Sequence, residues 1–124
     1  MDQQRRIVPV DEFTERLAQI RQRFASTLCG KIDDNFAALP KLSDRGADAI
    51  AMIVTVHRKL HEICGIAPSI GFPATGKAAR AAESVLREPA QTKRVLTTEE
   101  IVSLIDEFSC LRDAAQFDLQ SGTA

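Results

Sequence analysis

The chain has 124 residues, enough for one domain with a hydrophobic core. Its formal net charge of −1 gives no indication of a nucleic acid or an anionic membrane as a partner. No apolar run is long enough to span a bilayer, and the N-terminal sequence lacks the apolar core of a signal peptide. Three cysteines without paired spacings indicate reduced thiols, so we expect a cytoplasmic protein.

The first third of the chain predicts a long amphipathic helix. Residues 1–10 are expected to be a loose lead-in, because Pro9 favours an extended backbone before it. Asp11 suits the N-cap of a helix that ends before Pro40, either as one helix or as two nearly continuous ones. Its apolar positions recur at steps of three or four: Phe13, Leu17, Ile20, Phe24, Leu28, Ile32 and Phe36.

A second helix is expected to start at a cap on Ser43 or Asp44 and to run towards Ala67. Pro68 would stop or kink it, because proline cannot donate the next helical hydrogen bond. At about 100° per residue, one side of this helix forms the core face. That face consists of Ala49, Ile53, Val56, Leu60, Ile63 and Ala67.

The last part of the chain predicts two further helices. A turn at residues 71–73 places Pro73 in the first turn of a third helix, which runs to about Glu88. Residues 89–96 are expected to be a loop, and Thr97 and Glu100 have the spacing of a capping box that opens the last helix. Its apolar stripe consists of Ile101, Leu104, Ile105, Phe108, Leu111 and Ala115.

These patterns predict the fold class. The alternation typical of strands is absent, and the amphipathic segments are joined by short connections. We therefore expect an all-α protein, an antiparallel four-helix bundle with or without a short extra N-terminal helical element. Residues 11–120 would form this single domain. A bundle of this length can close its own core, so we expect a monomer.

His61 lies on the flank of the predicted core face of the second helix, one turn after His57. Ile50 and Val54 widen the apolar arc beside it, beyond what one bundle interface needs. This position predicts a partly exposed imidazole at the edge of an apolar docking surface, to which His57 would also contribute. Gly65, one turn further on, either begins the end of the helix or lets a partner backbone approach closely.

The segment from His61 to Gly71 reads His-Glu-Ile-Cys-Gly-Ile-Ala-Pro-Ser-Ile-Gly, and the small-residue run 78–83 follows it. It resembles the core of the histidine-containing phosphotransfer (HPt) domain, His-x-Leu-Lys-Gly-x-Ala-x-x-x-Gly followed by an Ala/Leu-rich helix carrying a Glu. HPt domains relay phosphoryl groups between aspartates of response-regulator receiver domains. The resemblance implies that His61 carries the phosphoryl group and that Gly65 opens the approach to it.

The resemblance also implies the partners and the kind of activity. The expected function is a histidine phosphocarrier in a multistep two-component phosphorelay, working with receiver domains and a sensor (hybrid) histidine kinase. Such a domain is a phosphotransfer intermediate rather than a multiple-turnover enzyme on a small substrate. It has no cofactor of its own, because the receiver domain brings the Mg²⁺.

Cys64 stands where the family has its lysine, so another cation would have to neutralise the phosphoryl group. Arg58 and, from the third helix, Lys77, Arg80 and Arg87 are the candidates, of which we favour Lys77 and Arg80. A basic third helix would complement the acidic pocket of a receiver. The last helix is instead acidic, with Glu99, Glu100, Asp106, Glu107, Asp113 and Asp118 against Arg112.

Three other interpretations remain open. The loss of the lysine fits a non-catalytic HPt-like adaptor that docks response regulators or a histidine kinase without carrying phosphate. A plain helical interaction module would make the motif accidental. His57, His61 and Cys64 could bind Zn²⁺, but no fourth ligand is evident, so we do not expect a metal site.

Overall fold

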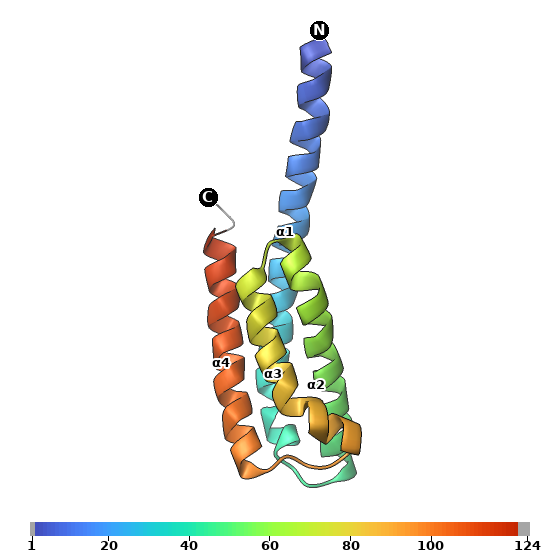
Figure 1. Cartoon of the computed structure of the whole chain (residues 1–124), viewed down its shortest axis with the longest axis vertical. Helices are drawn as coiled ribbons and strands as arrows, with labels where there is room; N and C mark the ends of the chain where they lie inside the picture. The colour runs from blue at the N-terminus through green and yellow to red at the C-terminus, as the bar shows by residue number, and fades with distance from the viewer. Residues whose placement is uncertain (1, 122–124) are drawn as a thin grey trace.

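The structure, a computed structural model, describes the backbone of residues 2–121 and the side chains of residues 12–121. It is an all-α, antiparallel four-helix bundle, and the described residues contain no strand (Figure 1). The elements are α1 (Asp2–Leu42), α2 (Ala47–Ile66), the short 3₁₀ helix η1 (Ala67–Ile70), α3 (Pro73–Thr92) and α4 (Thr98–Ser121). The predicted fold class is therefore confirmed.

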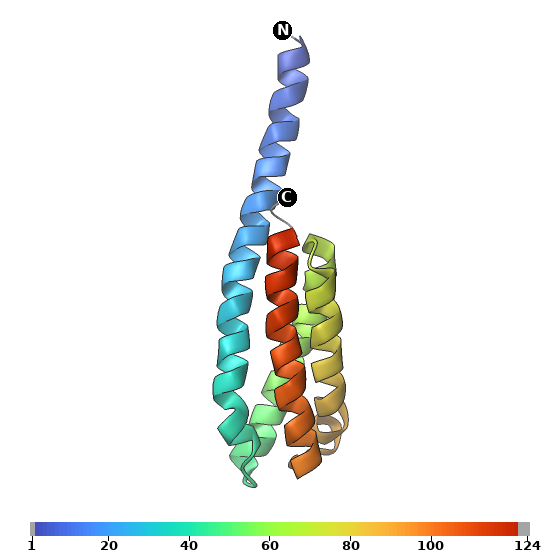
Figure 2. The ribbon, with the colours of Figure 1, turned by 90° about the vertical axis from the view of Figure 1, so that its left-hand side faces the viewer.

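The helices follow one another around the bundle. α2 packs against α3, α3 against α4, and α1 closes the ring against α2 and α4 (Figures 1 and 2). All six residues predicted for the core face of α2 are buried. In α4 the predicted stripe is buried at Leu104, Phe108, Leu111 and Ala115, whereas Ile105 is 43% exposed. Within residues 2–121, no helix combines the length and hydrophobicity needed to cross a membrane.

The start of α1 differs from the expected loose lead-in. Residue 1 lies outside the described residues, but the helix already begins at Asp2 and continues without a break through Gly30. Its N-terminal half projects beyond the other helices, so no neighbouring helix covers it (Figures 1 and 2). Phe13, Leu17 and Ile20 are consequently exposed, although their spacing continues that of the core positions.

Two helices continue past the prolines that were predicted to end them. α1 includes Pro40 and ends at Leu42, and α3 includes Pro89 and ends at Thr92. Each proline lies within the last turn or so of its helix, where a lost hydrogen bond or a bend affects only the few residues that follow it. The loop expected at residues 89–96 is thereby shortened. Lys93 ends α3 in a left-handed conformation (φ 54°), and its N–H donates to the carbonyl of Pro89.

Of the three predicted helix caps, two are wrong and one is confirmed. α1 already begins at Asp2, so Asp11 lies within the helix and is not its N-cap. Gly46, rather than Ser43 or Asp44, occupies the N-cap of α2. The Ser43 hydroxyl instead donates to the carbonyl of Leu39 at the end of α1. The capping box of α4 is confirmed: the Glu100 N–H donates to Thr97 Oγ1 (3.1 Å), and the Thr97 N–H donates to Glu100 Oε1 (2.9 Å).

The connection from α2 to α3 is compact. η1 starts before Pro68, as the expected stop in α2 requires, and Gly71 then turns the chain with φ +84°. Pro73 lies in the first turn of α3, as predicted. Arg21 of α1 ties this turn down by donating from Nε to the carbonyl of Ile70 (3.0 Å).

Asp118 does not belong to the solvated acidic face expected for the last helix. Its side chain is buried, and its Oδ2 accepts hydrogen bonds from the N–H (2.7 Å) and the hydroxyl (2.8 Å) of Thr75. α4 therefore satisfies a backbone donor in the first turn of α3, a role usually taken by a residue next to the helix itself.

Candidate functional site

An exposed histidine held by a buried carboxylate is the centre of the candidate site. His61 lies in the last two turns of α2, and its side chain is 75% exposed. Its Nδ1 lies 2.8 Å from Oε2 of Glu83 in α3, whose side chain is only 7% exposed. The imidazole therefore reaches into solvent while one of its nitrogens is anchored to the bundle.

The second oxygen of Glu83 is also occupied. Arg87, one turn further along α3, donates from Nη2 to Glu83 Oε1 over 3.2 Å. Burial by itself raises the pKa of Glu83, but the hydrogen bonds from His61 and Arg87 outweigh it, and the pKa lies below its ordinary value. The carboxyl group is consequently ionised near neutral pH.

The charge on Glu83 decides which nitrogen of His61 carries a proton. An ionised carboxylate can only accept a hydrogen bond, so Nδ1 of His61 must be the donor. In the neutral imidazole this leaves Nε2 without a proton and with a free lone pair. The arrangement thus presents a nucleophilic nitrogen at the protein surface and fixes the orientation of its ring.

The site lies on a regular seam between α2 and α3, which run antiparallel. His61 meets Glu83, and one turn on, Cys64 lies close enough to the Arg80 guanidinium to be influenced by it. Burial and the charge of Glu83 raise the pKa of the Cys64 thiol, and Arg80 opposes them.

The next contact along this seam joins Pro68 to Gly76. A Cβ at Gly76 would lie only 3.0 Å from Cγ of Pro68, so the two elements approach as closely as they do because this residue is glycine. This close approach helps to set the register that places Arg80 beside Cys64 and Glu83 beside His61.

A shallow hollow of about 240 Å³ opens beside this seam. It is lined by Cys64, Pro68, Pro73, Gly76, Lys77 and Arg80. Lys77 and Arg80, the two cations of α3 that the sequence favours, therefore border the same hollow. Cys64, which stands where the family has its lysine, lies beside them. Both side chains are exposed, and neither forms an ion pair within the described part of the chain.

The other predicted site residues are spread around His61. Ile50 and Val54 are half-buried on α2, and Gly65 is exposed, with open space where a Cβ would lie. His57 is half-buried, and its Nε2 is enclosed without a hydrogen-bond partner among the described residues. Arg58 is exposed and takes part in no ion pair of the described chain.

The structure adds Glu83 and Arg87 to the site. The Glu of the motif was not assigned a role from sequence, and Arg87 was considered only as a source of positive charge. A signal was present, because Glu83 falls among the buried positions of α3 with Ala79, Ala82 and Leu86. A carboxylate within such a stripe requires a partner. Which partner it finds depends on the register of α2 against α3, which periodicity along one helix does not contain.

No group of three or more His, Cys, Asp or Glu side chains in the described residues is arranged to hold a metal ion. His57, His61 and Cys64, which raised the question of Zn²⁺, therefore do not form such a group with one another. His61 uses its Nδ1 for Glu83, and Cys64 lies against Arg80.

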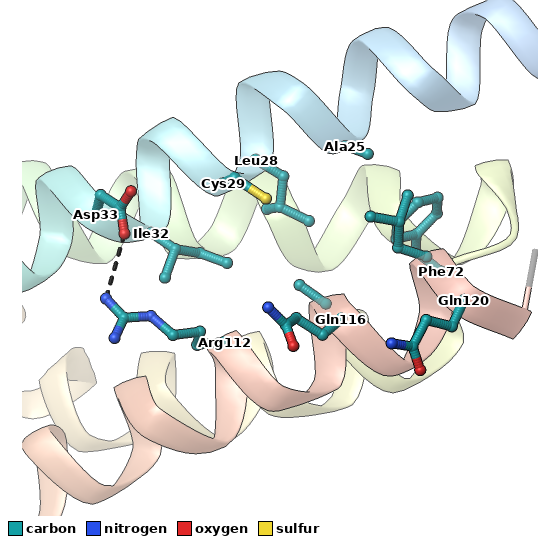
Figure 3. A pocket seen from close by; sticks show the side chains of 11 residues that line it. Ala25, Leu28, Cys29, Ile32, Asp33, Phe72, Arg112, Gln116 and Gln120 are labelled. Carbon is teal, nitrogen blue, oxygen red and sulfur yellow. Dashed lines mark hydrogen bonds and ion pairs between the residues drawn. The ribbon is translucent and has the colours of Figure 1, made fainter.

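A second hollow, of about 390 Å³, lies between α1 and α4 (Figure 3). Its floor is apolar, formed mainly by Leu28, Ile32 and Phe72, and the ion pair of Asp33 with Arg112 (3.2 Å) crosses one end. Gln116 and Gln120 project from α4 at its rim. None of its lining residues belongs to the His61 site, so the two hollows belong to different helix pairs.

No family model matches the chain, and the searches of curated proteins and of solved structures likewise found no match. The function is therefore inferred from the geometry of His61, its anchor and the surrounding charges.

Proposed function

We propose that the protein is a histidine phosphocarrier of a multistep phosphorelay, in which Nε2 of His61 accepts and donates a phosphoryl group. The observation that carries this proposal is the pairing of an exposed imidazole with a buried, ionised carboxylate on its other nitrogen. A carrier nitrogen must protrude far enough to enter a partner's active site, yet stay oriented for in-line attack. The exposure of the His61 side chain meets the first requirement, and its hydrogen bond to Glu83 meets the second.

The chemistry follows from the same contact. The Nε2 lone pair attacks the phosphorus of a phospho-aspartate, an N–P bond forms, and the P–O bond breaks with its electrons returning to the aspartate carboxylate. The imidazole ring gains positive charge in this step. Glu83 lies against Nδ1–H and stabilises that charge, and the reverse transfer passes the phosphoryl group to a second aspartate.

The surroundings of His61 fit docking to a receiver domain. Gly65 presents no side chain one turn beyond the histidine, and the half-buried Ile50 and Val54 offer apolar surface on the same helix. The partners would be response-regulator receiver domains and a sensor (hybrid) histidine kinase in the cytoplasm. Mg²⁺ would belong to the receiver, and the carrier would act as a monomer without a cofactor of its own.

A second function is favoured by one observation. Cys64 supplies no positive charge beside His61, which fits a bundle that docks receivers or a kinase without carrying phosphate. In that adaptor, the apolar surface and Gly65 would keep their docking role, and His61 would be an exposed contact residue.

Intact-mass measurement after incubation with phosphoramidate distinguishes the two functions. The sample is kept at neutral to alkaline pH, because phosphohistidine is labile in acid. We expect one added phosphoryl group in the wild type and in His57→Gln, and none in His61→Gln. His57→Gln is the matched control, since it removes the other imidazole from the same helix.

Addition that persists in His61→Gln would place the acceptor elsewhere and contradict the proposal. No addition to any sample, followed by none from a phosphorylated receiver domain, would favour the adaptor. Circular dichroism of His61→Gln should give the wild-type helicity and nearly the wild-type melting temperature, because the His61 side chain is largely exposed.

A further inference from the structure

We propose that Arg80 of α3 is the cation that binds the phosphoryl oxygens on His61, so that one helix carries the acceptor and the facing helix carries the charge. This inference rests on the proposed function and names a phosphate-binding residue within it. A phosphoryl group on Nε2 would carry negative charge at the protein surface, and positioned cations are the usual means of stabilising it during transfer.

The antiparallel seam places Arg80 beside Cys64, one helical turn along α2 from the histidine. His61 pairs with Glu83, and one turn later on α2, Cys64 lies against Arg80, one turn earlier on α3. The Pro68–Gly76 contact continues the same register. Successive contacts of this kind are separated by roughly 5 Å, one helical turn. The guanidinium, on a long and flexible side chain, can cover that separation.

The other cations near His61 are less suited. Arg87 is already bound to Glu83 Oε1. On a helical wheel, Arg58 falls roughly 90° away from the line of residues through which α2 faces α3. Lys77 borders the same hollow as Arg80, but it lies a further turn from Glu83 along α3.

Arg80 is also available. Its side chain is exposed, and no ion pair of the described residues includes it. Its neighbour across the seam is the Cys64 thiol, which offers a guanidinium far weaker hydrogen bonds than a phosphoryl oxygen would. Cys64 leaves room for Arg80 there, whereas a lysine at the same position would repel it.

The test measures the initial rate of phosphoryl transfer from phosphoramidate to His61, and the half-life of the phosphohistidine formed, by intact mass. Arg80→Ala should slow acceptance about tenfold or more, the usual scale for losing one charge-assisted hydrogen bond. Arg80→Lys should recover part of the rate. Lys77→Ala removes the same charge from the same helix and hollow, and should slow acceptance clearly less than Arg80→Ala, because Lys77 lies a further turn from Glu83.

A second variant separates binding of phosphate from any structural effect. Cys64→Lys introduced into Arg80→Ala returns a cation to the neighbouring position on α2, and should restore most of the lost rate. A structural defect at position 80 would not respond to this change.

The outcomes distinguish this inference from the proposed function. Equal rates for Arg80→Ala and the wild type, with His61 phosphorylated in both, would overturn the role of Arg80 alone. A defect in Lys77→Ala as large as that in Arg80→Ala would also overturn it, because a general loss of positive charge would then suffice. Absence of any phosphoryl transfer to the wild type would overturn both proposals.

Discussion

Two buried carboxylates, Glu83 and Asp118, illustrate how differently the two sides of α3 are used. Asp118 binds the N–H and hydroxyl of Thr75, and all three groups are enclosed in the bundle. Glu83 is about as well buried, but of its partners His61 is largely exposed and Arg87 is half-exposed. One carboxylate thus completes a helix end, while the other holds a reactive group at the surface.

The exposure of its hydrogen-bond partners indicates whether a buried carboxylate stabilises the fold or orients a reactive side chain. A buried acid with buried partners acts on stability, because losing it leaves donors without hydrogen bonds. A buried acid with an exposed imidazole as partner affects mainly the orientation and protonation of that ring, since the freed groups can be hydrated by water. Substitutions at the two positions should therefore have opposite consequences for stability and for transfer.

The largest effect on stability is expected for Asp118→Ala. It removes both hydrogen bonds to Thr75 in a buried setting, and should lower the free energy of unfolding by about 3 kcal/mol. Denaturation in urea measures this, with Asp113→Ala, an exposed acid on the same helix, as a control expected within about 0.5 kcal/mol of the wild type. If Asp118→Ala lowered the free energy of unfolding no more than Asp113→Ala does, Asp118 would not have the structural role assigned to it.

Glu83→Gln should have its main effect on transfer. The amide keeps the shape of the side chain but no longer supplies the negative charge that holds Nδ1–H and stabilises the ring, so phosphorylation of His61 should slow at least about tenfold. Stability should change by about 1 kcal/mol or less, because Arg87 is half-exposed and can be hydrated.

Initial rates from phosphoramidate provide the measurement for Glu83→Gln. Glu62→Gln, which removes an exposed acid next to His61, is the control and should transfer at the wild-type rate. Equal rates for both variants would show that Glu83 does not position the histidine for reaction.

Substitutions at two glycines test whether close packing sets the register of α2 against α3. Gly76→Ala would bring a Cβ to 3.0 Å from Pro68 and should destabilise the bundle by about 1 kcal/mol or more. Gly65→Ala meets open space within a helix and should stabilise it by about 0.5 kcal/mol. Thermal melting of both variants checks the signs, and a stabilised Gly76→Ala would mean that close approach does not set this register.

A surface carboxylate should show a smaller, pH-dependent effect. The hydrogen bonds from Arg94, whose Nη1 and Nη2 each lie 2.8 Å from a carboxylate oxygen, lower the pKa of Glu100 to about 2 from 4.5. The folded state therefore favours the ionised form. Its contribution to stability should be complete above pH 4.5 and should disappear as the pH falls from about 4.5 to about 2.

Urea denaturation of the wild type and of Glu100→Gln across this pH range tests the expectation. Glutamine can keep the capping contact with Thr97 but cannot ionise, so the variant should lose less stability on acidification. Parallel losses in both proteins would assign the acid sensitivity to other groups.

Much of the fold was predictable from local patterns. The spacing of Ile53, Leu60 and Ile63 placed the core face of α2, and Thr97 with Glu100 marked the start of α4. Other predictions from the same local patterns were wrong. Pro40 and Pro89 were read as helix ends although both helices continue past them. Phe13 belongs to the predicted amphipathic stripe of α1, but its side chain is exposed.

For the candidate site, the sequence singled out His61, Cys64 and Arg80 but could not pair them. The exposure of His61 follows from its position on the flank of the α2 stripe. Its bond to Glu83 and the proximity of Cys64 to Arg80 depend on how α2 and α3 slide past each other.

The sequence by itself thus determined the four helices and most of the residues that face the core, because the period of a helix is a local property of the backbone. Only the tertiary structure decided that Asp118 is buried, that Glu83 holds His61 through Nδ1, and that Arg80 lies beside Cys64. These contacts join residues more than ten positions apart on different helices. Their register is set by close packing at Pro68 and Gly76 and by the need of each buried carboxylate for a hydrogen-bond donor.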